Sequence, residues 1–154
     1  MHETTPPAPP SGTFQGPLHL FPLRVYYEDT DVSGVVYHAN YLRWFERARS
    51  DMLHLLGIEQ GKAYEQGLGN YTVAELTIRY FAPARLDDAV TIATTALELG
   101  AASVRLRQRA LKGDDLLADA TVRVGFISPD GRPTRQPAAW RAAFDTLRPA
   151  KDAA

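Results

Sequence analysis

The chain has 154 residues, of which 45% are hydrophobic and 23% charged, and its formal net charge is −1. This composition suits one globular domain with a sizeable core. The near-neutral charge argues against a nucleic-acid partner bound through its phosphates. The chain has no cysteine, which excludes disulfides, thiolate metal sites and thiol catalysis. We expect a cytoplasmic protein without an integral membrane segment, because no apolar run reaches bilayer length.

Both ends of the chain are predicted to lie outside the folded domain. Proline and glycine are frequent in residues 1–19, which we expect to form a disordered leader because they cannot bury enough surface to fold. Residues 149–154 are expected to fray. The folded domain is therefore predicted to cover residues 20–148.

Hydrophobic periodicity predicts a strand, a long helix and then a run of strands. Aromatic and β-branched residues at 20–28 indicate the first strand. The long helix is predicted at 40–56, because apolar residues recur there on one face and Gly57 can end it. The remaining predictions are strands at 70–81, 88–99, 102–111 and 117–127 and short helices at 59–66 and 137–147. This order is typical of an α+β domain, with an antiparallel five-stranded sheet wrapped around one long central helix.

An acidic turn between the first strand and the long helix holds the candidate chemistry. Glu28, Asp29 and Asp31 lie within four residues, and in extended backbone Asp29 and Asp31 would point the same way. Gly34 permits a sharp bend or a close approach to a ligand. Free N–H groups at the helix start would stabilise an oxyanion formed from a carbonyl. A solvated turn, whose carboxylates bond their own backbone, is the competing interpretation.

A metal site in the same turn is the other chemistry that we considered. Its ligands would be Asp29, Asp31 and His38, but their spacing matches no established ligand pattern. No metal is therefore predicted. Asn40, at the start of the helix, has helix capping as its ordinary structural role.

Two adjacent motifs carry a resemblance to a known family. They read Tyr27-Glu28-Asp29-Thr30-Asp31-x-x-Gly34-Val35-Val36-Tyr37-His38-Ala39-Asn40-Tyr41 and Trp44-Phe45-Glu46-Arg47-Ala48-Arg49. A later turn, Tyr80-Phe81-Ala82-Pro83, precedes an acidic pair. With these motifs the chain resembles the hotdog-fold acyl-CoA thioesterases of the 4-hydroxybenzoyl-CoA thioesterase type, and most of all the Tol-Pal-associated YbgC branch. The resemblance covers about residues 21–137.

The resemblance implies a single hotdog domain that hydrolyses acyl-CoA thioesters to free acid and coenzyme A without a cofactor. It implies that Asp31 is the catalytic carboxylate, acting as a nucleophile or as a general base on water. It also implies that a main-chain N–H at His38 polarises the thioester carbonyl. The His38 side chain is a second candidate, orienting the carboxylate or contacting the acyl group, with packing at the helix start as the alternative.

Substrate-binding candidates flank the acidic turn and follow the last strand. They are Tyr27, Gly34, Val35, Tyr37 and Asn40 around the turn, and Arg132 and Arg135 as contacts for the coenzyme A phosphates. The strand arginines Arg105, Arg107 and Arg109 are expected instead to form a solvated face that pairs with Asp119.

Two charged residues of the long helix also need an account. Arg49 falls within the apolar sector, where an unpaired charge is costly, so we expect a structural ion pair with Glu46, Asp29 or Glu75. Some hotdog thioesterases use a carboxylate on the central helix. Glu46 is therefore the second choice for the catalytic residue.

The partners and the competing functions follow from the same resemblance. We predict a homodimer or homotetramer, because the edge strand is open and because two protomers join their sheets in hotdog relatives, with the active site between them. Acyl-CoA is the expected substrate, and acyl carrier protein stays open as a second acyl donor. The main alternative is a hotdog protein that binds acyl-CoA without hydrolysing it. A hydratase using His38 and Glu46 is a third hypothesis, but it would leave Asp31 idle.

Overall fold

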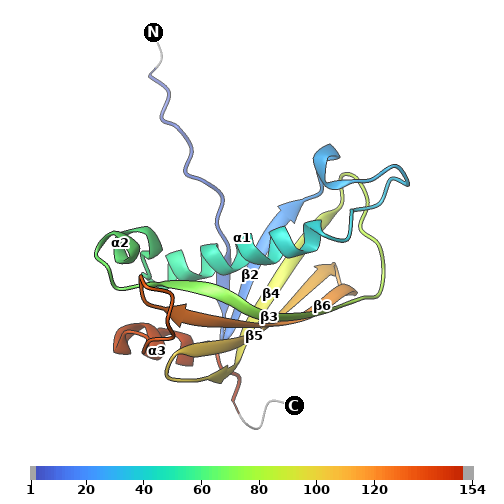
Figure 1. The fold of residues 1–154 in the computed structure, drawn as a ribbon. Helices are drawn as coiled ribbons and strands as arrows, with labels where there is room; N and C mark the ends of the chain where they lie inside the picture. The colour runs from blue at the N-terminus through green and yellow to red at the C-terminus, as the bar shows by residue number, and fades with distance from the viewer. Residues whose placement is uncertain (1–2, 151–154) are drawn as a thin grey trace.

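A six-stranded antiparallel sheet forms the centre of the molecule (Figure 1). The computed structural model describes residues 3–150, so the predicted fraying of residues 151–154 lies outside the described part. The strand order is β1-β2-β4-β5-β6-β3. The strands are β1 (Thr13–Gln15), β2 (Leu18–Arg24), β3 (Asn70–Tyr80), β4 (Ala89–Leu99), β5 (Ser103–Lys112) and β6 (Asp115–Ile127).

One long helix, α1 (Asn40–Leu55), lies across one face of this sheet (Figure 1). Its buried face consists of Asn40, Tyr41, Trp44, Phe45, Ala48, Met52 and Leu53. Two shorter helices follow, α2 (Gln60–Glu65) and α3 (Ala138–Asp145). The long helix and the four strands after it confirm the predicted α+β fold, with bounds that differ by one or two residues.

The N-terminal segment is more ordered than its composition predicts. β1 pairs with β2, so the sheet has six strands where five were predicted. Ser11 Oγ and the Gly12 N–H both donate to the carboxylate of Asp51 on α1. The predicted disordered leader therefore extends too far, because residues 11–19 gain hydrogen bonds from the sheet and from α1 that composition does not reveal. Disorder of the residues before Ser11 stays a prediction.

The first long strand also ends earlier than predicted. β2 stops at Arg24, and Tyr27–Asp29 form a short 3₁₀ turn (η1) in place of the last part of the predicted strand. Asp29 Oδ2 accepts the Tyr26 N–H at 2.8 Å, which caps this turn. Asp29 and Asp31 therefore do not share one face of an extended strand, as the sequence suggested.

The two edges of the sheet differ in length. β1 has three residues, whereas β3 has 11 and pairs only with β6 among the described residues. The exposed face of β5 and β6 carries the predicted cross-strand pair. Nη2 of Arg107 lies 2.8 Å from Oδ2 of Asp119. Within residues 3–150, no helix combines the length and apolar character that crossing a bilayer requires.

Candidate active site

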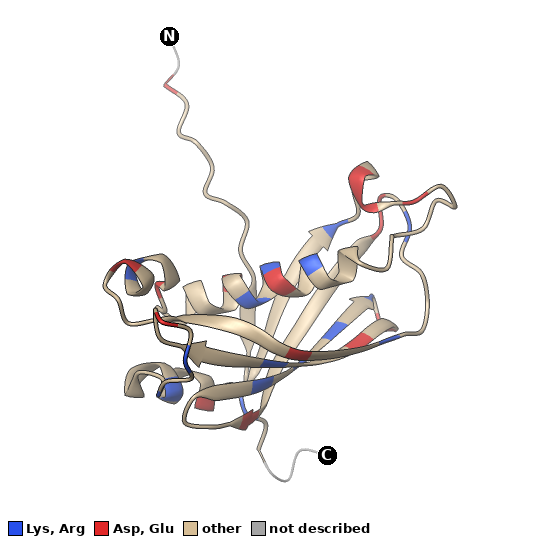
Figure 2. Cartoon of the chain, in the orientation of Figure 1, with Lys and Arg blue, Asp and Glu red and all other residues tan. Residues whose placement is uncertain are grey.

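The acidic turn is a narrow loop closed by its own backbone hydrogen bonds. The Asp31 N–H donates to the Val35 carbonyl at 2.9 Å, and the Tyr37 N–H donates to the Asp29 carbonyl at 2.9 Å. Gly34 adopts a φ of 81°, in the left-handed region where glycine is favoured. Figure 2 shows acidic residues on this loop, where it projects beyond the start of α1, and others distributed over the rest of the chain.

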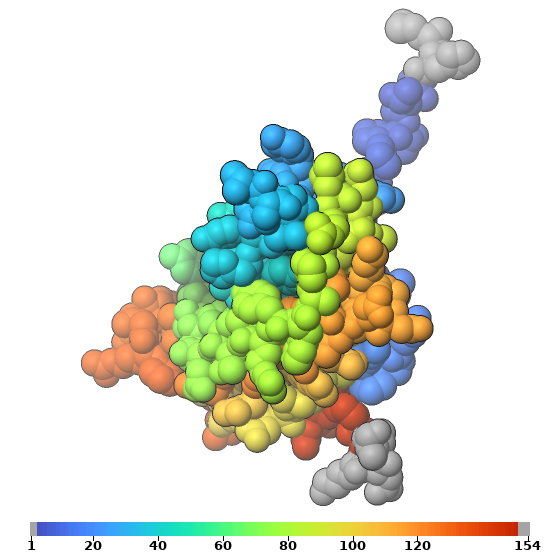
Figure 3. Space-filling view, turned by 90° about the vertical axis from the view of Figure 1, so that its right-hand side faces the viewer, coloured from blue at the N-terminus to red at the C-terminus, as the bar shows by residue number. Residues whose placement is uncertain are grey.

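Two contacts fix the loop to the body of the protein. The Val36 N–H donates to the Ala84 carbonyl at 2.9 Å, which joins the loop to the segment between β3 and β4. Figure 3 shows the two segments side by side. The buried Asn40 side chain donates from Nδ2 to the Asp29 carbonyl at 2.8 Å. Asn40 therefore does not cap α1, whose cap residue is Ala39, but holds the loop against the helix start.

Asp31 lies exposed at the tip of this loop. Its Oδ1 accepts hydrogen bonds from the backbone N–H of Ser33, at 2.8 Å, and from the Ser33 hydroxyl. These bonds stabilise the charged form and lower the pKa of the Asp31 carboxyl below its ordinary value. Asp31 is therefore ionised at neutral pH. Among residues 3–150, no group of three or more His, Cys, Asp or Glu side chains is arranged to hold a metal ion.

The start of α1 presents two backbone donors. The Tyr37 carbonyl accepts the Asn40 N–H at 2.9 Å, whereas the structure gives the N–H groups of His38 and Ala39 no acceptor within residues 3–150. Free N–H groups at a helix start favour an anion or a polarised carbonyl oxygen. This is the arrangement predicted at His38, with Ala39 as a second donor that the sequence did not single out.

A cavity of about 320 Å³ lies beside these donors. It is lined by Val36, His38, Tyr41, Tyr80, Phe81, Ala82 and Pro83. The His38 ring stacks on Tyr37, with centroids 4.5 Å apart, and meets the edge of Tyr80 at 6.2 Å. Tyr80, at the end of β3, also donates from its hydroxyl to the His38 carbonyl at 2.9 Å. Tyr80 was missed as a site residue, because an aromatic residue in a strand is ordinarily part of a packed surface.

The structure brings only some of the predicted binding residues together. Gly34, Val35, Tyr37 and Asn40 belong to the loop and the helix start, and Tyr27 lies on η1 with 84% of its surface exposed. Arg132 and Arg135 lie elsewhere. They follow Ile127, which pairs with Asn70, whereas Tyr80 at the other end of β3 pairs with Ala118. Ten residues of strand span about 33 Å, so these arginines are far from His38 within one chain.

A second cavity, of about 260 Å³, lies between α1 and β3 and includes Glu46 and Arg49. Arg49 donates to Gln108 Oε1 at 2.9 Å, and within the described chain it has no carboxylate partner. The predicted ion pair of Arg49 is therefore wrong. The amide oxygen of Gln108, on β5, accepts its hydrogen bond where a carboxylate was expected. Burial lowers the pKa of Arg49, and the charge of Glu46 partly opposes this. Since Glu46 and His38 line different cavities, the structure does not assemble the pair needed for a hydratase.

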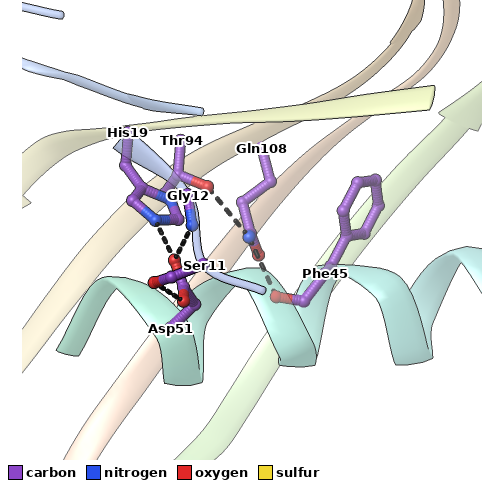
Figure 4. Close-up of polar contacts among 7 residues, drawn as sticks. All are labelled: Ser11, Gly12, His19, Phe45, Asp51, Thr94 and Gln108. Atoms are coloured by element: carbon purple, nitrogen blue, oxygen red, sulfur yellow. Dashed lines mark hydrogen bonds and ion pairs between the residues drawn. The ribbon is translucent and has the colours of Figure 1, made fainter. Parts of the chain in front are cut away.

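A polar network beneath α1 was also missed by the sequence analysis (Figure 4). His19 Nε2 lies 2.8 Å from Asp51 Oδ2, and the His19 ring is fully buried. Gln108 donates from Nε2 to the Phe45 carbonyl at 3.0 Å and to Thr94 Oγ1 at 3.1 Å. This network ties α1 to the sheet and the N-terminal segment to α1. It lies away from the acidic loop, and we assign it a structural role.

Comparisons with known proteins show which proteins this chain resembles. A family model described as the thioesterase superfamily matches residues 33–118, which include His38 but begin just after Asp31. The acyl-CoA thioesterase YbgC of Haemophilus influenzae is 40% identical over 129 residues, covering 83% of this chain and 95% of the relative. The acyl-CoA thioester hydrolase YbgC of Escherichia coli O6:H1 is 40% identical over 113 residues, covering 73% and 84%.

A solved structure supports the same conclusion about the fold. The crystal structure of a probable thioesterase from Bartonella henselae superposes with a TM-score of 0.74 at 37% identity, covering 78% of this chain and 99% of that chain. The superposition and the family match confirm the predicted resemblance to the hotdog thioesterases.

Proposed function

The chain belongs to the thioesterase superfamily, and on that premise we propose that it hydrolyses acyl-CoA thioesters to a free carboxylic acid and coenzyme A. The observation that carries the proposal is a pair of N–H groups at the start of α1, those of His38 and Ala39, which have no acceptor within residues 3–150 and follow the loop of the ionised Asp31. The relatives from Haemophilus influenzae and Escherichia coli, each 40% identical, are named for the same activity.

The proposed chemistry assigns a separate task to each group. The two N–H groups hold the thioester carbonyl oxygen and stabilise the negative charge that develops on it. Asp31 either takes a proton from the attacking water or attacks the carbonyl carbon itself and forms an anhydride that water then hydrolyses. In both routes the C–S bond breaks and coenzyme A leaves as a thiolate that takes up a proton. Because both Ser33 bonds go to Oδ1, Oδ2 is the oxygen available for this step.

A second copy of the chain is proposed to complete the site, as a homodimer or homotetramer. β3 offers an 11-residue edge that is unpaired within the described chain, and a long free edge is suited to pairing with another strand. The acidic loop carries apolar side chains without cover, since Val32 is fully exposed and Tyr27 is 84% exposed. Exposed apolar side chains of this kind are typical of surfaces that a partner covers.

The same pairing would give a role to the distant arginines. If two β3 strands pair antiparallel about a twofold axis, the Asn70 end of one lies near the Tyr80 end of the other. The segment after β6, which carries Arg132 and Arg135, lies at the Asn70 end. We therefore propose that these two arginines contact the coenzyme A phosphates in the site of the neighbouring protomer.

The proposal is tested by the release of free thiol from short-chain, long-chain and aromatic acyl-CoAs and from an acyl carrier protein thioester. We expect turnover by the parent protein and a loss of at least about 10²-fold in Asp31→Asn, because a general base or nucleophile is removed. The matched control is Asp29→Asn, which changes a neighbouring carboxylate that caps η1. It should keep most of the activity.

Two outcomes would contradict the proposal. Tight binding of acyl-CoA with no thiol release by the parent protein would favour the non-hydrolytic binding function. Equal activity in the parent and Asp31→Asn would leave thioester hydrolysis standing but would remove Asp31 from it.

A further inference from the structure

We propose that Tyr80 is a positioning residue, whose hydroxyl orients the backbone donors that hold the thioester carbonyl. This inference rests on the proposed function and adds to it a residue outside the acidic loop. Tyr80 lies on β3, 42 residues after His38 in the chain, and the family resemblance includes it only as the first residue of the Tyr80-Phe81-Ala82-Pro83 turn, without a role. Its evidence is the set of contacts that it makes at the start of α1.

The backbone at the start of α1 is held through its carbonyl groups. The Tyr37 carbonyl accepts the Asn40 N–H at 2.9 Å, and the next carbonyl, that of His38, accepts the Tyr80 hydroxyl at 2.9 Å. Each of these carbonyls shares a planar trans peptide with the following N–H, which points the opposite way. Fixing the two carbonyls therefore fixes the directions of the His38 N–H and the Ala39 N–H.

The two anchors differ in where they come from. The bond from Asn40 closes the local turn that leads from Tyr37 into α1. The bond from Tyr80 comes from the sheet, and within the described residues it is the tertiary hydrogen bond on the peptide that carries the Ala39 N–H. Tyr80 thus connects the position of the second donor to the end of β3.

The Tyr80 side chain is itself well held. Its ring packs edge-on against Tyr41, with centroids 5.5 Å apart, and against His38 at 6.2 Å. The next residue, Phe81, donates its N–H to the Leu117 carbonyl at 2.8 Å, which keeps the end of β3 on the sheet. Partial burial raises the pKa of the Tyr80 phenol above its ordinary value, so the hydroxyl keeps its proton at neutral pH.

Pre-oriented donors are worth more than donors that must reorganise when charge develops. Removing one oxyanion donor outright typically costs about 10²–10³-fold in kcat. Loss of the Tyr80 hydroxyl leaves the Ala39 N–H in place but frees its peptide to rotate. We therefore expect about a ten-fold loss of kcat in Tyr80→Phe, with KM nearly unchanged, because the ring that lines the cavity is kept.

The matched control is Thr146→Val, at the end of α3. The Thr146 hydroxyl also donates to a backbone carbonyl, that of Ala143 at 2.6 Å, but it lies outside the acidic loop, β3 and the segment that carries Arg132 and Arg135. Its kcat should equal that of the parent protein. An unchanged kcat in Tyr80→Phe would overturn the inference, as would an increase in KM alone or an equal fall of kcat in both variants.

Two further readouts separate positioning from other roles. If Tyr80 only positions the backbone, the pH profile of kcat/KM should keep its shape in Tyr80→Phe; loss of its alkaline limb would overturn the inference in favour of proton donation. NMR order parameters of the His38 and Ala39 amides should fall in Tyr80→Phe and stay unchanged in Thr146→Val. Unchanged order parameters in Tyr80→Phe would overturn the positioning role of Tyr80. This measurement needs no substrate, so it can fail independently of the proposed function, whose failure would appear as no thiol release by the parent protein.

Discussion

Two aspartate–histidine pairs lie at different depths in this protein and have different surroundings. Asp31 and His38 are exposed, at the tip and base of the acidic loop, and the N–H groups of His38 and Ala39 have no acceptor in the described part of the chain. Asp51 and His19 lie beneath α1, where His19 is fully buried and Asp51 receives bonds from His19, Ser11 and Gly12 (Figure 4). The comparison teaches that free hydrogen-bonding capacity, and not residue type, distinguishes a candidate reactive site from a structural one.

The largest expected effect is on stability, from breaking the buried network at Gln108. The Gln108 side chain is fully buried and bonds to Arg49, Thr94 and the Phe45 carbonyl. Gln108→Ala leaves these groups without a partner and opens a cavity, so we expect a loss of about 3 kcal/mol in the free energy of unfolding. Urea denaturation measures it. The exposed Gln66→Ala is the control, and equal midpoints for the two variants would contradict the structural role of the network.

The second prediction concerns the pH dependence of stability through His19. Burial lowers its pKa below 6.5 despite the nearby Asp51, and His19 Nδ1 has no hydrogen-bond partner among residues 3–150. A neutral ring that donates from Nε2 to Asp51 fits both observations. The folded state binds a proton on His19 less readily than the unfolded state does. The stability that the neutral His19 contributes is therefore fully present above pH 6.5 and is lost as the pH falls towards the pKa of His19 in the folded state.

This pH effect can be assigned by substitution. Urea midpoints should fall between about pH 7 and pH 5 in the parent protein, and His19→Gln should flatten this step. The exposed His54→Gln should leave it as it is. A step that persists in His19→Gln would place the responsible group elsewhere.

A smaller effect is expected in the exposed loop, from the backbone of Gly34. Its φ of 81° is unfavourable for other residues, and a Cβ at this position meets no atom within 4 Å. Gly34→Ala should therefore cost about 1 kcal/mol through the backbone alone. The control is Gly61→Ala in α2, where φ is not positive and the space is equally open. Gly61→Ala should stabilise the protein slightly. Differential scanning calorimetry gives the melting temperature of each variant, and equal shifts of the two melting temperatures would contradict the strain at Gly34.

The sequence predicted the helix, the run of strands and the position of the acidic loop because each depends on local patterns. The apolar spacing of α1 and the alternation in β5 needed no knowledge of distant contacts. The sequence did not predict that Arg49 would bond to Gln108, that His19 would meet Asp51, or that Tyr80 would reach His38. Each of these contacts joins residues that are at least 32 positions apart, and such contacts follow from tertiary packing, which one sequence does not display.

The most direct test of this account measures activity and stability together in Asp31→Asn and Asp51→Ala. Asp31→Asn should lose at least about 10²-fold in thiol release and keep the melting temperature of the parent protein. Asp51→Ala should lose about 2 kcal/mol of stability and, while folded, keep most of its turnover. A catalytic defect in folded Asp51→Ala as large as that of Asp31→Asn, or full activity in Asp31→Asn, would contradict the distinction between the two pairs.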